Sequence, residues 1–249
     1  MKFPIATAAI AISILAFFLI LSSMLVFGSS EGIERFKFSF DEVQNIFFYN
    51  FAHVDYAHLL VNLAIIIGSG IVIERKLKSK DVVALFFAGS LFSALLFAAL
   101  DNEYAIVGAS AGAVALLTAA VAVDTKKALA LTIGLMLLAT VSIFAINSYI
   151  EDSTKSLKAQ VQTLENTKEI AERENNTELA QSTGTIIEQK NEQIYGIEQG
   201  VELKSRIPAS IEIHFFGSIF GAAYAFLFAR KEILRNVTSL KKMFAKMHF

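Results

Sequence analysis

Ser110 stands in the sequence GASAG (108–112) and is the first candidate for chemistry in this chain. The segment fits G-x-S-x-G, the pattern of a serine nucleophile on a tight strand-to-helix turn. It also fits G-x-x-x-G, the small-residue spacing by which membrane helices pack closely. A nucleophile elbow needs a preceding β-strand, whereas a short polar loop, DNEY (101–104), precedes this serine between two apolar segments. The soluble-hydrolase interpretation is therefore excluded, and the packing interpretation remains.

Three further polar side chains lie in apolar segments, where such groups are costly and therefore indicate a function. His58 and Asn62 are four residues apart, so they lie on one face of a helix. His214, Gly217 and Gly221 also share one face, and the two glycines let that face approach another backbone closely. We expect His214 to point into a tight contact between two helices.

The partner of that contact is expected to be the small-residue face formed by Gly108 and Gly112, beside which Ser110 begins its helix. Ser110 would lie roughly 7–8 Å below the outer end of its span at the helical rise of 1.5 Å per residue. His214 would lie about 10 Å below the outer end of the last span by the same rise. His58 and Asn62 would fall on the same outer-leaflet level.

A hydroxyl, a base and several hydrogen-bond donors at one depth favour nucleophilic catalysis. A neutral histidine such as His214 could take the proton of Ser110, which is a poor nucleophile until a base does so. The resulting oxyanion needs donors, which His58, Asn62 and the backbone N–H of Ser110 could supply. Since no acidic residue is placed to orient the histidine, we infer a Ser-His dyad rather than a triad.

The composition is that of a membrane protein. Hydrophobic residues make up 55% of the 249 residues, charged residues only 18%, and the mean hydropathy is +0.55. A net charge of −1 gives no reason to expect a nucleic-acid partner, and the absence of cysteine excludes thiol chemistry. Six apolar stretches are long enough to cross a bilayer as helices, which predicts an all-α polytopic fold: 3–27, 57–74, 82–100, 105–123, 128–150 and 207–229.

The Lys and Arg residues predict the orientation of these spans. An inside N-terminus puts the RKLKSK turn (75–80) and the basic tail (231–249) in the cytoplasm. We therefore expect a multi-pass protein of the cell membrane with both termini cytoplasmic.

Two segments interrupt the membrane helices. Residues 28–56 mix aromatic and charged side chains, and we expect them to lie in the outer interface between the first helices of a membrane unit, 1–150. Residues 151–206 form a polar insertion before the last membrane helix, 207–230. Its apolar residues recur at helical seam spacing, which predicts a helical hairpin with its break at Ser182–Gly184; disorder is the alternative.

Three motifs make the sequence resemble the rhomboid family of intramembrane serine proteases. They are FAHVDYAHLLVN (51–62), GASAG (108–112) and HFFGSIFG (214–221), in the family's order and on the expected spans. The resemblance covers about residues 1–150 and 207–230 and implies a six-helix bundle, with the polar insertion between its fifth and sixth helices. It implies Ser110 as the nucleophile and His214 as the general base, with His58 and Asn62 lining the oxyanion hole.

The resemblance also implies that Gly217 and Gly221 permit close helix packing, that transmembrane proteins are cleaved near their outer ends, and that no metal or organic cofactor takes part. Many members have a tyrosine one turn after the serine, where this chain has Val114. The alternative is a catalytically silent relative that binds or escorts membrane clients. A further expectation is contact with a partner or substrate through 151–206.

Overall fold

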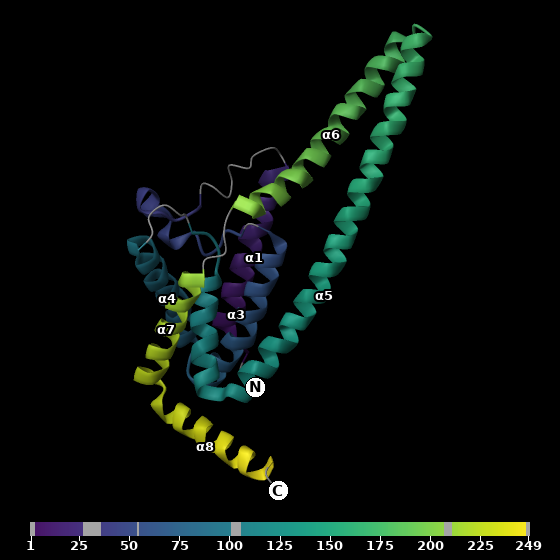
Figure 1. The fold of residues 1–249 in the computed structure, drawn as a ribbon. Helices are drawn as coiled ribbons and strands as arrows, with labels where there is room; N and C mark the ends of the chain where they lie inside the picture. Colours follow the sequence, from purple (N-terminus) through teal and green to yellow (C-terminus); the bar gives the residue numbers. More distant parts are fainter. Residues whose placement is uncertain (1–2, 27–35, 54, 101–105, 207–210, 248–249) are drawn as a thin grey trace.

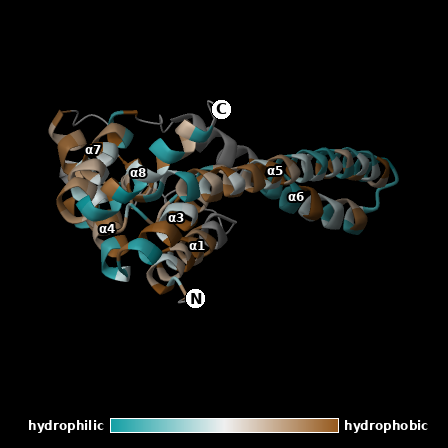
Figure 2. Ribbon diagram, turned by 90° about the horizontal axis from the view of Figure 1, so that it is seen from below, coloured by the Kyte–Doolittle hydropathy of each residue, from teal (hydrophilic) through white to brown (hydrophobic). Residues whose placement is uncertain are grey.

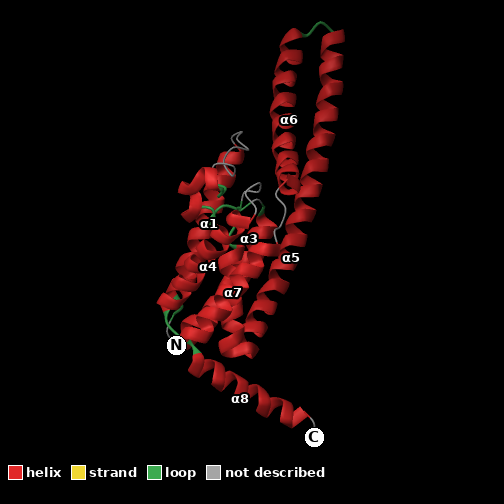
Figure 3. Cartoon of the chain, turned by 60° about the vertical axis from the view of Figure 1, so that its left-hand side comes forward, coloured by secondary structure: helices red, strands yellow, loops and turns green. Residues whose placement is uncertain are grey.

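The computed structural model describes residues 3–26, 36–53, 55–100, 106–206 and 211–247. Within these residues every regular element is a helix, and the one strand-like contact is an isolated antiparallel bridge between Phe38 and Ile106 (Figure 3). The expected all-α class is therefore confirmed. Parts of the interfacial segment (28–35), the loop 101–105 and the start of the last span (207–210) lie outside the described residues.

The helices follow the apolar pattern of the sequence. Four of the described helices are long and apolar enough to cross a membrane, namely α3, α4, α5 and α7, and α1 carries a shorter apolar stretch. The elements in chain order are α1 (Ile5–Val26), η1 (Phe40–Phe47), α3 (Tyr56–Lys76), α4 (Ser79–Leu100), α5 (Ser110–Arg173), α6 (Thr177–Arg206), α7 (Ile211–Phe228) and α8 (Arg230–Met247).

Helix α5 has 64 residues and bends sharply at Asp124, whose backbone leaves the helical region (φ −155°, ψ 77°). Its first arm, up to the bend, runs through the bundle; its second arm turns back beside the bundle and continues well beyond it (Figure 1). The first arm covers the predicted span 105–123 from Ser110 onward, and the second arm contains the predicted span 128–150. Since both spans belong to one bent helix, the count of six membrane-spanning helices stays a prediction. We call the end of the bundle at Ser110 the outer end and the end at Asp124 the inner end.

The first arm of α5 is the centre of the bundle. It packs against α3, α4 and α7, and its buried positions are mainly alanines such as Ala113, Ala119 and Ala120. Small side chains let helices approach closely where lipid supplies no hydrophobic driving force. The second arm exposes large apolar side chains such as Leu138 and Phe144, as expected of a helix that faces lipid.

The polar segment 151–206 continues the second arm of α5 without a break at residue 150 and returns as α6 (Figure 1). The predicted break at Ser182–Gly184 is wrong, because these residues lie inside α6. The turn is at Asn175, which adopts a left-handed conformation (φ 55°) that asparagine tolerates better than most residues. Asn176 then caps α6 by accepting a hydrogen bond from the N–H of Leu179 at 3.2 Å.

Both described termini lie at the inner end of the bundle, opposite the start of α5 (Figures 1 and 3). Viewed from that end, apolar residues dominate the bundle, while the far part of the α5–α6 hairpin is mostly hydrophilic (Figure 2). The hairpin therefore extends away from the apolar helices that a bilayer would cover.

Candidate active site

Ser110 is the first residue of α5, and the helix begins with a hydrogen bond from the N–H of Ala113 to the carbonyl of Ala109 at 2.9 Å. The N–H groups of a first helical turn have no acceptor within the helix. They also carry the positive end of the helix dipole. The Ser110 hydroxyl therefore stands beside donors that suit a developing negative charge.

The interfacial segment holds the loop in front of Ser110. Phe38 and Ile106 exchange backbone hydrogen bonds of 2.8 and 2.9 Å, and the N–H of Gly108 donates to the carbonyl of Tyr49 at 2.8 Å. The Tyr49 hydroxyl donates to the carbonyl of Ser90 on α4 at 2.8 Å. Burial raises the pKa of Tyr49, so its phenol stays protonated and keeps this bond.

Gly108 has a positive φ of +110°, and a β-carbon there would lie 2.5 Å from Cε1 of His58. The His58 ring therefore lies directly against the loop two residues before Ser110. Asp55 positions this part of α3, because its carboxylate caps the helix by accepting from the N–H of His58 at 2.8 Å.

Asn62, one turn further along α3, is buried and donates from Nδ2 to Nε2 of His53 at 3.1 Å. Since Nε2 must accept this bond, the proton of the neutral ring is on Nδ1, which lies 3.2 Å from the carbonyl of Phe51. Burial, with a smaller contribution from the neighbouring His58, whose ring centroid lies 5.1 Å away, lowers the pKa of His53 to about 3. His53 is thus neutral at physiological pH.

His214 lies in the first turn of α7, at the outer end, and α7 touches α5 closely just below it. A β-carbon at Gly217 would lie 2.5 Å from the carbonyl oxygen of Ala111, and one at Gly221 would lie 2.3 Å from that of Ala115. Gly217 is one turn from His214, and Ala111 directly follows Ser110. The backbone contact therefore sets the histidine and the serine at one level on adjacent helices.

No hydrogen bond joins the Ser110 hydroxyl to the His214 ring among the described residues. Catalytic hydrogen bonds are often long without substrate and shorten when it binds. Both residues are only partly buried.

The glycines of GASAG have other neighbours than expected. We expected both to face the last membrane helix, but Gly108 lies against His58 of α3. A β-carbon at Gly112 would lie 2.6 Å from the carbonyl oxygen of Phe86 on α4. Among the described glycines, Gly217 and Gly221 on α7 make the close contact between α7 and α5. The sequence showed which residues are small but not which helix each of them faces.

His53 had no predicted role in the site. The structure makes it the hydrogen-bond partner of Asn62, and the signal that could have revealed it is its place nine residues before Asn62, beside a second histidine. No group of three or more His, Cys, Asp or Glu side chains within the described part of the chain is arranged to hold a metal ion.

Comparison with protein families gives a match to the Rhomboid domain over residues 41–155. The match contains His53, His58, Asn62 and Ser110 and ends before His214. Comparisons with curated proteins and with solved structures gave no match. The family match agrees with the motifs and with the apolar helices around the site: the chain is a multi-pass membrane protein that contains a Rhomboid domain.

Proposed function

We propose that this protein is an intramembrane serine protease that hydrolyses peptide bonds of transmembrane proteins near the outer leaflet. The observation that carries the proposal is the contact of Gly217 with the carbonyl of Ala111, which brings the start of α7 against the start of α5. The rhomboid family acts on transmembrane substrates within the bilayer, and it usually includes intramembrane serine proteases.

In the proposed reaction His214 takes the proton of the Ser110 hydroxyl as its oxygen attacks the scissile carbonyl carbon. The tetrahedral oxyanion accepts hydrogen bonds from the backbone N–H of Ser110, the remaining amide N–H of Asn62 and the ring of His58. His214 then gives the proton to the leaving amine, which leaves an ester on Ser110. A water molecule, deprotonated by His214, hydrolyses the ester and restores the serine.

The orientation follows from the same proposal. The inner end carries both described termini and the basic helix α8, so the positive-inside rule puts it in the cytoplasm. Ser110 and His214 then face the outer leaflet, and water reaches them from outside the cell.

A fluorophosphonate probe tests the nucleophile directly, because it reacts only with an activated serine. We expect the purified protein to be labelled and Ser110→Ala to lose all labelling. Ser142→Ala is the matched control, because its hydroxyl lies on the lipid-exposed second arm and donates only to the carbonyl of Leu138. Equal labelling of wild type and Ser110→Ala would refute the assignment.

The base and the cleavage are tested by placing the protein and a transmembrane substrate together in liposomes. His214→Ala should lose both labelling and cleavage, since the hydroxyl then has no base. Labelling without cleavage of any transmembrane substrate, or no labelling of a folded wild type, would favour a client-binding relative over a protease.

A further inference from the structure

Helix α8 follows α7 after a single residue, Ala229, and lies at the inner end of the bundle, opposite the start of α5 (Figure 1). Its charge is strongly unbalanced, with Glu232 as its one acidic residue. The basic residues are Arg230, Lys231, Arg235, Lys241, Lys242 and Lys246. A helix that begins where a membrane span ends must start at the level of the lipid headgroups.

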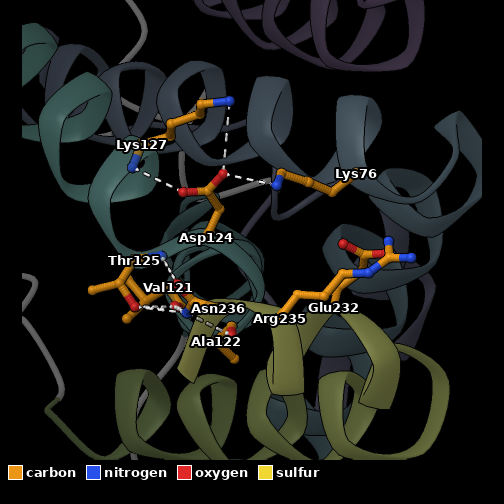
Figure 4. A network of polar contacts seen from close by, with 9 residues as sticks. All are labelled: Lys76, Val121, Ala122, Asp124, Thr125, Lys127, Glu232, Arg235 and Asn236. Atoms are coloured by element: carbon orange, nitrogen blue, oxygen red, sulfur yellow. Dashed lines mark hydrogen bonds and ion pairs between the residues drawn. The ribbon is translucent and has the colours of Figure 1, made fainter. Parts of the chain in front are cut away.

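Asn236 fastens α8 to the bend of α5 (Figure 4). Its Nδ2 donates to the carbonyls of Val121 and Ala122 at 3.2 and 3.0 Å, and its Oδ1 accepts from the N–H of Thr125 at 3.3 Å. The bend at Asp124 interrupts the backbone hydrogen bonds of the helix at these carbonyl and N–H groups. The side-chain amide of Asn236 replaces them, acting as both donor and acceptor. This attachment fixes which side of α8 faces the bundle.

Three different faces of α8 result. The side toward the bundle contains the partly buried residues Ile233, Asn236, Leu240 and Met243. A second side is apolar but uncovered, since Leu234, Val237 and Phe244 are 68%, 42% and 55% exposed. A third side is basic and exposed, with Lys231, Arg235, Lys242 and Lys246. At 3.6 residues per turn the centres of these faces are roughly 90–140° apart.

The basic residues have few partners within the protein. Arg235 pairs with Glu232 at 2.7 Å, and the Arg230 guanidinium lies 4.7 Å from the centre of the Phe226 ring. All four lysines are exposed and make no ion pair with any described residue; Lys231, Lys242 and Lys246 share the basic side, and Lys241 lies on the apolar side between Val237 and Phe244. A row of unpaired lysines beside an uncovered apolar face is typical of a helix that lies in a membrane interface.

We propose that α8 is a binding site for the anionic phospholipid headgroups of the inner-end leaflet. The uncovered apolar face inserts at the boundary between headgroups and acyl chains, and the lysines contact the headgroup phosphates. The occupant is the bilayer rather than a soluble protein, because α8 begins one residue after a membrane span and its positive charge complements an anionic surface. This proposal does not depend on Ser110 being a nucleophile.

The experiment uses the absence of native cysteine, which allows one fluorophore to be placed at will. The full-length protein is labelled with an environment-sensitive dye at Leu234→Cys, on the apolar face, or at Ser239→Cys, on the exposed polar side, as the matched control. Each is reconstituted as single copies in nanodiscs of zwitterionic lipid alone or with anionic phosphatidylglycerol. We expect anionic lipid to shift the Leu234→Cys emission to the blue and to leave Ser239→Cys unchanged.

The charge requirement is tested by changing Lys231, Lys241, Lys242 and Lys246 to Gln together. Each lysine near an anionic surface contributes roughly a fivefold gain in binding, so the quadruple variant should bind roughly 600-fold more weakly and lose most of the response. High salt should likewise reduce the blue shift of the protein with its lysines intact, because salt screens the attraction to the headgroups. An unchanged melting temperature in detergent shows that the variant is folded.

Two results would overturn the proposal. A blue shift that is equal in both lipids and in the quadruple variant would mean apolar insertion without headgroup binding. No shift of the Leu234→Cys emission in either lipid would mean that the apolar face stays in solvent. A shift that appears only when a disc holds two proteins would mean that a second copy covers this face.

Discussion

The amide of Asn62 donates to Nε2 of His53 at 3.1 Å, and this one bond fixes both the amide and the tautomer of the ring. Because His53 is bound in turn to the carbonyl of Phe51, the orientation of Asn62 is set from the interfacial segment. The second N–H of Asn62 is then left for the proposed oxyanion. His53 is a positioning residue in this arrangement and touches no reacting atom.

Replacing His53 should therefore harm turnover without removing the nucleophile. In His53→Leu the Asn62 amide loses its acceptor, and a buried donor without a partner costs about 1–3 kcal/mol. We expect kcat for a transmembrane substrate to fall by roughly 10- to 100-fold, less than the 10²–10³-fold typical of a lost oxyanion donor. KM should change little, because His53 is buried.

His53→Gln is the matched control, because a glutamine can accept from Asn62 and donate to the carbonyl of Phe51. It should recover most of the kcat lost in His53→Leu. If both variants cleave at the wild-type rate, Asn62 does not depend on His53 for its position.

Acid should destabilise the protein through the same residue. The pKa of His53 is about 3 in the folded protein, against about 6.5 for an exposed histidine, so the unfolded state binds the extra proton. Stability is therefore unaffected above pH 6.5. It falls by roughly 1.4 kcal/mol for each pH unit between 6.5 and 3.

The measurement is the melting temperature in detergent from pH 7 to pH 4, compared between wild type and His53→Gln. Other groups that titrate in this range contribute equally to both proteins, so the difference isolates His53. Wild type should lose more stability than His53→Gln as the pH falls. Parallel curves would contradict a neutral buried His53.

Gly217 offers a test of the helix contact at the site. In Gly217→Ala the new methyl group would lie 2.5 Å from the carbonyl oxygen of Ala111, so α7 must move away from α5. Overpacking of this kind costs typically about 1–3 kcal/mol, and the shift also separates His214 from Ser110. We expect a lower melting temperature and a loss of fluorophosphonate labelling.

Gly134→Ala is the matched control, because nothing lies within 4 Å of a β-carbon at this position on the second arm of α5. Alanine favours a helix over glycine by about 0.5–1 kcal/mol, so this variant should be as stable as wild type or more so. Full labelling of Gly217→Ala would mean that the serine and the histidine tolerate a wider separation.

The sequence predicted the features that depend on local spacing. The helical class followed from apolar stretches, and the shared faces of His58 with Asn62 and of His214 with Gly217 followed from helical periodicity. Which helix each face packs against depends on contacts between distant segments. Helical periodicity carries no information about those contacts. Gly112 therefore faces α4, and His53 acquired a role only when Asn62 was placed beside it.

The hairpin turn shows the same limit at shorter range. Ser182–Gly184 has the composition of a break, but Ser182 donates back to the carbonyl of Leu179 and the helix continues. Asn175 ends α5 instead, because its backbone adopts the left-handed conformation. Asn175 and Asn176 interrupt the first apolar stripe in the sequence, and the turn lies at that interruption.

The outer part of the hairpin should be dispensable for the nucleophile. α6 packs mainly on α5, and Lys190 donates to Gln160 at 2.6 Å, which sets the register of the two helices. In the shortened variant, a short Asn-Gly turn replaces residues 161–189. This variant keeps the base of the hairpin and removes no contact of the first arm of α5. We expect unchanged labelling of Ser110 and an altered cleavage rate or substrate choice.

Lys190→Ala in the full-length hairpin is the control, because it removes one contact between the helices without shortening them. It should match wild type in both labelling and cleavage. Since the shortened variant retains the second arm through the membrane, a loss of labelling would show that the distal hairpin stabilises the bundle. Equal cleavage of every transmembrane substrate by the shortened and full-length proteins would show that the distal hairpin neither recruits nor excludes them.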